Sequence, residues 1–198
     1  MFNDRIKNGF RRIVQPLVSF FIKMKIDPNM LTLSGFLIAC ISGYFYSQGQ
    51  FILGLIVLVL SGINDTFDGM VARQTNKVTL FGAFFDSTID RFNEFAVLFG
   101  IGYFFNTWGM YLFSYLTFAS IFFSVMISYT RARAEGLNIK CSEGLMGRVE
   151  RVVFLIVASF FPLNIFKYMI ILYTVLTFIT VIQRMVIVKF AIMNKEVK

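Results

Sequence analysis

The chain has 198 residues, of which 57% are hydrophobic, 15% are charged and 26 are phenylalanine. Soluble proteins use roughly 45–50% apolar and about 25% charged residues, so this composition excludes an ordinary soluble domain and a disordered chain. With no histidine and only two cysteines, the chain also lacks the residues for histidine-dependent nucleophiles, His-ligated metal sites and a disulfide framework.

The first 25 residues combine apolar and basic positions at helical spacing. Apolar side chains recur every three or four residues from Phe2 to Phe21, while basic residues such as Arg5 and Arg11 occupy the other side. This pattern is typical of an amphipathic helix that lies in the membrane interface. A cleaved signal peptide is the alternative, but no A-x-A-like site follows a compact apolar core here.

Six apolar stretches follow, each close to the roughly 20 residues that a helix needs to cross a bilayer core of about 30 Å. They lie at residues 29–48, 50–72, 80–105, 109–134, 146–163 and 165–190. The chain has no internal repeat and no low-complexity linker. We therefore expect residues 1–198 to form a single all-α membrane domain, with six transmembrane helices preceded by an N-terminal interfacial amphipathic helix.

The basic residues predict the orientation of these spans. The formal net charge is +8, and of all Lys and Arg only Lys167 lies near the short turns at 47–50, 106–109 and 162–164. By the positive-inside rule, both termini and the polar connections are cytoplasmic. We expect a multi-pass protein of the plasma membrane whose charge attracts anionic headgroups. A nucleic-acid partner is not expected, because no soluble domain presents a basic face.

Four aspartates lie at helical spacing where the second predicted span ends and the third begins. Asp65 and Asp68 are three residues apart and Asp86 and Asp90 are four apart, so each pair projects from one face of its helix. Because a short polar loop joins the two helices, both pairs are expected to face each other near the cytoplasmic surface.

Carboxylates gathered in a low-dielectric setting repel one another unless protons or cations neutralise them. Ligands that are all oxygen, without histidine or cysteine, select a hard ion such as Mg²⁺ or Mn²⁺. Four carboxylates suffice for two ions about 3.5–4 Å apart, an arrangement used for in-line displacement at phosphorus. The sequence therefore predicts a site for two divalent ions.

Two other interpretations of the aspartates remain open. A purely structural ion-pair network is one, although burying carboxylates is a poor way to gain stability. A divalent-cation channel or transporter is the other. Against it, both pairs lie near one membrane face, whereas transport sites favour the midplane.

The aspartates belong to a longer pattern, D-x2-D-G-x2-A-R-x8-G-x3-D-x3-D, which runs from Asp65 to Asp90. This segment resembles the signature of the CDP-alcohol phosphatidyltransferases at every position. The resemblance implies an integral membrane enzyme that displaces CMP from CDP-diacylglycerol, or from an ether-lipid analogue, and joins an alcohol oxygen to the phosphoryl group. It also implies six transmembrane helices after an amphipathic helix, and a homodimer.

Carried over position by position, the resemblance implies that Asp65, Asp68 and Asp86 bind two Mg²⁺ or Mn²⁺ ions. Asp90 would be the catalytic base that deprotonates the attacking hydroxyl, and it would also touch the second ion. The donor nucleotide would be bound by Asn29, Thr32, Gly69, Arg73 and Thr79. Within that set, the glycine would let the nucleotide approach the backbone, and the arginine would pair with the diphosphate.

Three arginines downstream are candidates for binding the acceptor. Arg131, Arg151 and Arg184 come from three predicted helices and can converge beside the aspartates. Convergent guanidinium groups suit a phosphate dianion, and an unpaired arginine within an apolar run is costly. For Arg131 the alternative is simple interfacial anchoring.

The segments around these arginines resemble the branch of the family that uses inositol 1-phosphate, the phosphatidylinositol-phosphate and archaetidylinositol-phosphate synthases. In that branch, arginines at the matching positions bind the acceptor's phosphate. Two positions depart from its G-x-x-E-R-x-E-R segment, where Gly147 replaces a glutamate and Val149 a common proline. Inositol 1-phosphate is therefore the expected acceptor, with glycerol 3-phosphate, serine or another polyol as alternatives.

Overall fold

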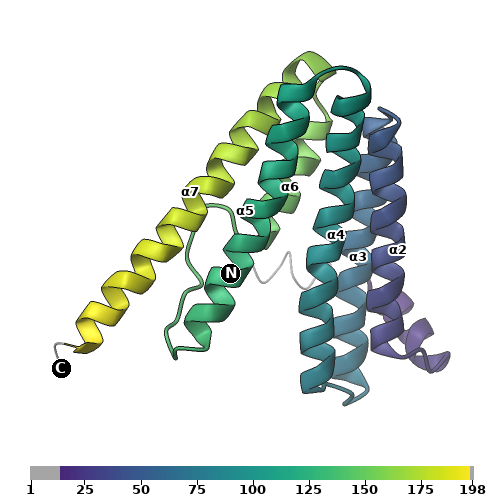
Figure 1. Ribbon diagram of the computed structural model, residues 1–198. Helices are drawn as coiled ribbons and strands as arrows, with labels where there is room; N and C mark the ends of the chain where they lie inside the picture. Colours follow the sequence, from purple (N-terminus) through teal and green to yellow (C-terminus); the bar gives the residue numbers. More distant parts are fainter. Residues whose placement is uncertain (1–13, 197–198) are drawn as a thin grey trace, which may run out of the picture.

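The computed structural model describes residues 14–196, and this part of the chain is helical without a strand (Figure 1). A short helix, Val14–Lys23, comes first. The bundle that follows consists of α2 (Pro28–Ser47), α3 (Phe51–Gln74), α4 (Leu80–Thr107), α5 (Tyr111–Glu135), α6 (Arg148–Ser159) and α7 (Leu163–Glu196).

Four of the described helices, α2, α3, α5 and α7, are long and apolar enough to cross a membrane. The six-span count therefore stays a prediction. The fifth predicted span, 146–163, is wrong in extent, because α6 has only 12 residues and reaches about 18 Å at 1.5 Å per residue. Its first turn instead begins with charged residues. In α4, charged residues between Asp86 and Glu94 interrupt the apolar run.

The helix Val14–Lys23 covers only part of the predicted interfacial helix, since residues 1–13 lie outside the described part of the chain. Val14 and Val18 are buried against Phe67 and Val71 of α3. At the end of α3, the side-chain amides of Gln15 and Gln74 donate hydrogen bonds to each other, at 3.0 and 3.1 Å. The short helix is thus packed on the half of α3 that carries the aspartates.

α2 and α4 approach each other closely because both present small residues. A Cβ atom on Gly43 would lie 2.3 Å from the carbonyl oxygen of Ala96, and one on Gly100 would lie 2.0 Å from the carbonyl oxygen of Gly43. Polar side chains add cross-links to α3, where Ser61 Oγ donates to the Gly35 carbonyl at 2.9 Å. These contacts hold α2, α3 and α4 together as one layer.

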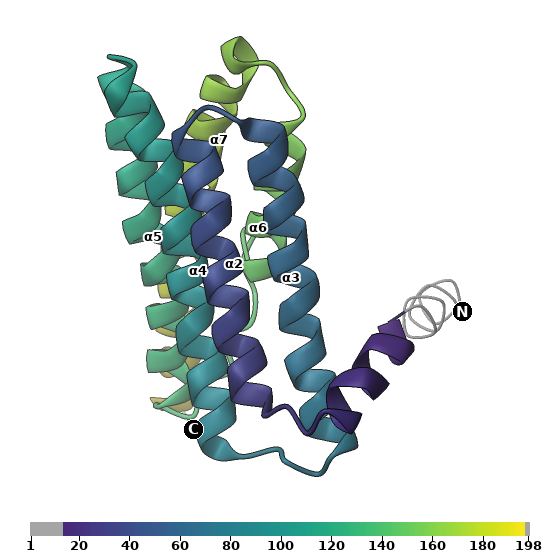
Figure 2. The ribbon, with the colours of Figure 1, turned by 90° about the vertical axis from the view of Figure 1, so that its right-hand side faces the viewer.

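The principal hydrophobic core lies toward the end of the bundle with the short turns. It is rich in aromatic residues and joins both halves of the molecule: Tyr46, Leu58, Val97, Leu98, Ile101, Phe104, Phe105, Met146, Leu155, Ala158, Phe166, Ile170 and Tyr173. At the opposite end α5 and α7 diverge from α2, α3 and α4, as Figure 1 shows. Figure 2 shows the connection between α3 and α4 at this same end. The connections at 75–79 and 136–147 lie at this more open end, where the aspartates are.

Candidate active site

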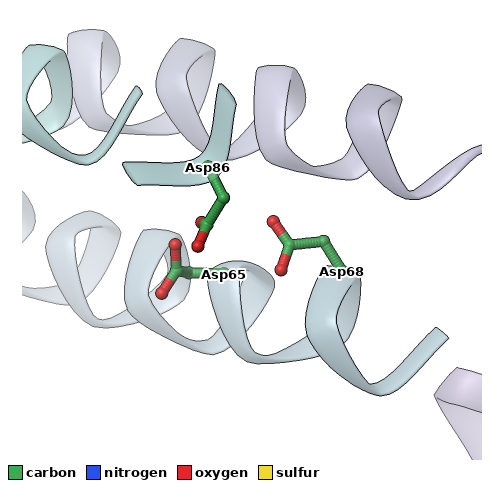
Figure 3. Close-up of side chains that lie close together, drawn as sticks. All are labelled: Asp65, Asp68 and Asp86. Carbon is green, nitrogen blue, oxygen red and sulfur yellow. The ribbon is translucent and has the colours of Figure 1, made fainter. Parts of the chain in front are cut away.

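Three carboxylates from two helices meet at the open end of the bundle. Asp65 and Asp68 are on α3 and Asp86 is on α4, and one oxygen of each lies within 4.8 Å of the others. Figure 3 shows the three side chains pointing toward one another. The helical spacing and the short 75–79 connection bring these three together, whereas Asp90, the fourth aspartate expected there, is not part of the group.

Asp68 is the most buried of the three, and a third helix supports it. The hydroxyl of Thr32, on α2, donates to Asp68 Oδ2 at 2.6 Å, and both side chains are buried. A charged acceptor makes this bond stronger than one between neutral groups. Thr32 therefore orients a candidate metal ligand, besides lining the neighbouring pocket.

Asp90 lies one turn beyond Asp86 on α4 and is paired with arginines. Arg148 Nη2 forms an ion pair with Asp90 Oδ1 and also donates to Asp65 Oδ1 at 3.1 Å. Arg91 Nη1 lies 3.4 Å from the other oxygen of Asp90. The sequence reasoning missed Arg148 as a partner of the aspartates. Its only signal was its place in the same charged segment as Arg151.

A pocket of about 270 Å³ opens beside the three carboxylates. Asp68 and Asp86 form part of its wall, and so does every residue that the sequence assigns to the donor nucleotide: Asn29, Thr32, Gly69, Arg73 and Thr79. The structure therefore brings all five together around one space, although they come from α2, α3 and the connection to α4.

The local structure explains why a glycine occupies position 69 and a threonine position 79 of the pocket wall. A Cβ on Gly69 would lie 3.2 Å from Arg73 Nη1, so its absence leaves room for the guanidinium and for whatever binds beneath it. Thr79 is the N-cap of α4 and accepts a hydrogen bond from the Gly82 amide at 2.9 Å. Thr79 therefore also has a local role in starting the helix.

Arg151 is buried deep in the bundle, at 2% exposure. Its Nε and Nη2 donate to the two carboxylate oxygens of Glu94, the latter at 2.8 Å, and its Nη1 donates to the Met146 carbonyl at 2.9 Å. Tyr173 Oη also donates to Glu94, at 3.0 Å. Every arm of this guanidinium thus has a protein partner, which the sequence reasoning did not foresee. Glu94 follows Asp90 at the same spacing of four residues, which is the only feature of the sequence that indicates Glu94 lies on the same face of α4.

The other two candidate arginines have different surroundings. Arg184 is buried and donates to the carbonyl oxygens of Glu143 and Ile127, so it joins α7 to the 136–147 connection and to α5. Arg131 is half exposed and pairs with Glu135 at 2.8 Å. Arg184 bonds to α5 at Ile127, one turn before Arg131, but the donors of all three arginines point to protein acceptors.

The three-carboxylate group fits a hard divalent ion. It offers oxygen ligands alone, from side chains close enough to share one cation, which is the chemistry that Mg²⁺ and Mn²⁺ prefer. An ion there would also neutralise like charges that otherwise repel one another at the edge of the 270 Å³ pocket. The donor set therefore agrees with metal binding, and a phosphate-rich ligand would lie directly beside it.

Comparison with known proteins agrees with this geometry. The family model for CDP-alcohol phosphatidyltransferases matches residues 25–189. This chain belongs to that family. It is therefore an enzyme of phospholipid biosynthesis that uses a CDP-alcohol donor, which disfavours the transporter interpretation of the aspartates.

Curated relatives of this family member extend over nearly its whole length. An archaetidylinositol phosphate synthase from Pyrococcus horikoshii is 38% identical over 182 residues, covering 91% of this chain and 90% of the relative. One from Methanothermobacter thermautotrophicus is 33% identical over 191 residues, covering 94% and 95%.

A solved structure of the phosphatidylinositol phosphate synthase of Mycobacterium tuberculosis, with CDP-DAG bound, has the same fold. Its TM-score is 0.82 at 26% identity, covering 89% of this chain and 94% of that one. A second structure of that enzyme, in complex with manganese and citrate, gives a TM-score of 0.79 at 25% identity over 87% of each chain.

Proposed function

We propose that this family member transfers a phosphatidyl group, or its ether-lipid counterpart, from the CDP-linked lipid to inositol 1-phosphate and releases CMP. The observation that supports this most directly is the three-carboxylate group at the wall of a 270 Å³ pocket lined by Arg73, Gly69 and Thr32. A nucleotide diphosphate needs cations beside its phosphates and an uncharged surface beside its base. Arg73 supplies a cation in this pocket, and Pro28 and Val78 supply uncharged surface.

Two divalent ions, Mg²⁺ or Mn²⁺, are part of the proposal. Asp65, Asp68 and Asp86 would hold the first, and Asp90 would contribute to the second. When bound, the ions stabilise charge on the diphosphate and on the attacking and leaving oxygens. The manganese in the solved relative supports a metal site in this fold.

The donor would lie in the pocket with its diphosphate between Arg73 and the aspartates. Arg73 is within the last turn of α3, so its guanidinium can pair with phosphate oxygens while its stem stays on the helix. Gly69 leaves the backbone of α3 accessible beneath it. Asn29 and Thr79 would contact the nucleotide from the ends of α2 and α4. That a relative binds CDP-DAG supports this donor.

Asp90 would act as the base. Its carboxylate is buried one turn from Asp86 on the same helix, so it can accept the proton of an acceptor hydroxyl that approaches the donor's phosphorus. As the new oxygen–phosphorus bond forms, the bond to the CMP oxygen breaks, and the proton remains on Asp90 until it passes to solvent.

The acceptor would carry its own phosphate, bound by Arg131, Arg184 and Arg151. The names of the relatives support inositol phosphate, and Arg184 of α7 bonds to α5 one turn before Arg131. Arg131 is accessible, whereas Arg151 would have to release Glu94 before it could bind phosphate. Glycerol 3-phosphate, serine or another polyol are the alternatives.

The membrane arrangement completes the proposal. The positive-inside rule places the open end, both termini and the active site at the cytoplasmic face of the plasma membrane. Several exposed phenylalanines on α4 and α5, including Phe92, Phe95 and Phe122, suit contact with lipid or with a second copy of the chain in a homodimer.

The decisive experiment uses the purified protein with CDP-diacylglycerol, Mg²⁺ and a panel of acceptors. We expect CMP release with inositol 1-phosphate, little with free inositol, and its loss in Asp86→Asn. Asp27→Asn is the matched control, because Asp27 is an exposed carboxylate that caps α2 and asparagine caps equally well. CMP release with glycerol 3-phosphate alone would reassign the acceptor.

A further inference from the structure

Arg148 lies between two of the four aspartates and belongs to neither of their helices. Its Nη2 donates to Asp65 Oδ1 at 3.1 Å and forms an ion pair with Asp90 Oδ1. α6 begins at this residue, directly after the 136–147 connection. One guanidinium therefore ties α6 to α3 and α4 at the active site.

Three of the four aspartates form one group, and the fourth, Asp90, is paired with Arg148. Asp65, Asp68 and Asp86 already place one oxygen each within 4.8 Å of the others. Asp90 is outside that group, and the arginine contacts the oxygen that it would offer to an ion shared with Asp65. A divalent cation at that position would repel the guanidinium, because both would lie against the same buried carboxylate of Asp90.

We propose that Arg148 takes the place of the second ion while that ion is absent, by pairing with Asp65 and Asp90, and that it withdraws when the ion binds. The inference rests on the proposed two-ion function. It implies an order: the first ion binds to the three-carboxylate group, of which Arg148 contacts only Asp65, and the second binds only in exchange for Arg148. The second ion is therefore the weaker of the two.

The surroundings of Arg148 permit such an exchange, and those of its neighbour do not. The Arg148 side chain is 40% exposed, so it can withdraw to the open end and remain solvated. Arg151, one turn later on α6, is 2% exposed, and each of its three guanidinium nitrogens donates to Glu94 or Met146. The Arg151–Glu94 pair therefore holds α6 in place while the side chain of Arg148 withdraws.

Mn²⁺ binding to the purified full chain, without substrates, tests the inference. Electron paramagnetic resonance measures both the free ion and the magnetic coupling between two adjacent bound ions. The wild type should bind one ion tightly and a second, coupled ion more weakly. In Arg148→Gln the second affinity should rise at least about tenfold, the factor that 1.4 kcal/mol represents, and by more than the first affinity, because Arg148 contacts only one of the three first-site carboxylates. Arg148→Met provides an independent variant without the charge.

Arg133→Gln is the matched control, because it removes one exposed charge of α5 that contacts no aspartate. It should behave as the wild type. An unchanged or weaker second affinity in both Arg148 variants would overturn the inference, as would equal tightening in Arg133→Gln, which would indicate a general charge effect. Failure of the wild type to bind any Mn²⁺ or release CMP would instead overturn the proposed function.

Discussion

Arg151 of α6 and Glu94 of α4 form a two-point ion pair in the interior of the bundle, with both carboxylate oxygens engaged. Tyr173 of α7 donates to the same carboxylate. Three helices that are far apart in sequence are thus joined directly behind Asp90. The pair therefore links the packing of α6 and α7 to the turn of α4 that follows Asp90.

Removing one partner of this pair should destabilise the protein. Arg151→Ala leaves Glu94 charged and buried, which typically costs about 3–5 kcal/mol. The double variant Glu94→Gln with Arg151→Met should cost clearly less than the sum of the single changes, because no lone charge remains. Thermal unfolding in detergent measures this. Wild-type stability of Arg151→Ala, together with a raised acceptor KM, would show that the arginine serves the acceptor alone.

The hydrogen bond between Thr32 and Asp68 predicts a smaller effect. Thr32→Val keeps the shape of the side chain but removes the donor to Asp68, a bond to a charged group worth about 1.5–3 kcal/mol. We expect Mn²⁺ affinity at the first site to fall by about tenfold while the fold is kept. Ser34→Ala is the control on the same helix, since Ser34 bonds only to the Leu31 carbonyl and Asn64. Equal effects of the two changes would contradict this role.

Asp90→Asn separates binding from chemistry. The amide cannot accept the hydroxyl proton, so turnover at saturating substrates should fall by at least about a hundredfold, while CDP-diacylglycerol still binds in the pocket that Asp90 does not line. Equilibrium donor binding and steady-state rates together measure this. Intact turnover with collapsed donor affinity would instead make Asp90 a binding residue.

Arg184→Ala tests the acceptor's phosphate. If this arginine binds it, the KM for inositol 1-phosphate should rise at least about tenfold, with the donor KM nearly unchanged. If Arg184 only fastens the 136–147 connection through Glu143 and Ile127, the melting temperature falls and both KM values move together. Arg133→Ala, an exposed change on α5, serves as the control. Arg184→Lys should rescue only part of the acceptor affinity, because a point charge lacks the planar fork.

The grouping of the candidate site residues was predictable from the sequence, because they lie on helices that follow one another along the chain and pack side by side. Asp65, Asp68 and Asp86 lie on two helices joined by a short connection, and helical periodicity alone turns them toward each other. The nucleotide-pocket residues lie at the adjoining helix ends for the same reason. Family membership and the activity class were likewise present in the spacing of the motif.

What the sequence could not determine is how the second half of the chain meets the first. The extent of α6 and the partners of Arg148, Arg151 and Arg184 depend on packing across helices separated by more than 50 residues. A buried guanidinium takes the nearest acceptors that can satisfy its donors, whichever helix supplies them. Only the tertiary structure decided that Arg151 pairs with Glu94 instead of facing an open pocket. A charge removed from water is stable only where an opposing charge and hydrogen-bond acceptors converge on it.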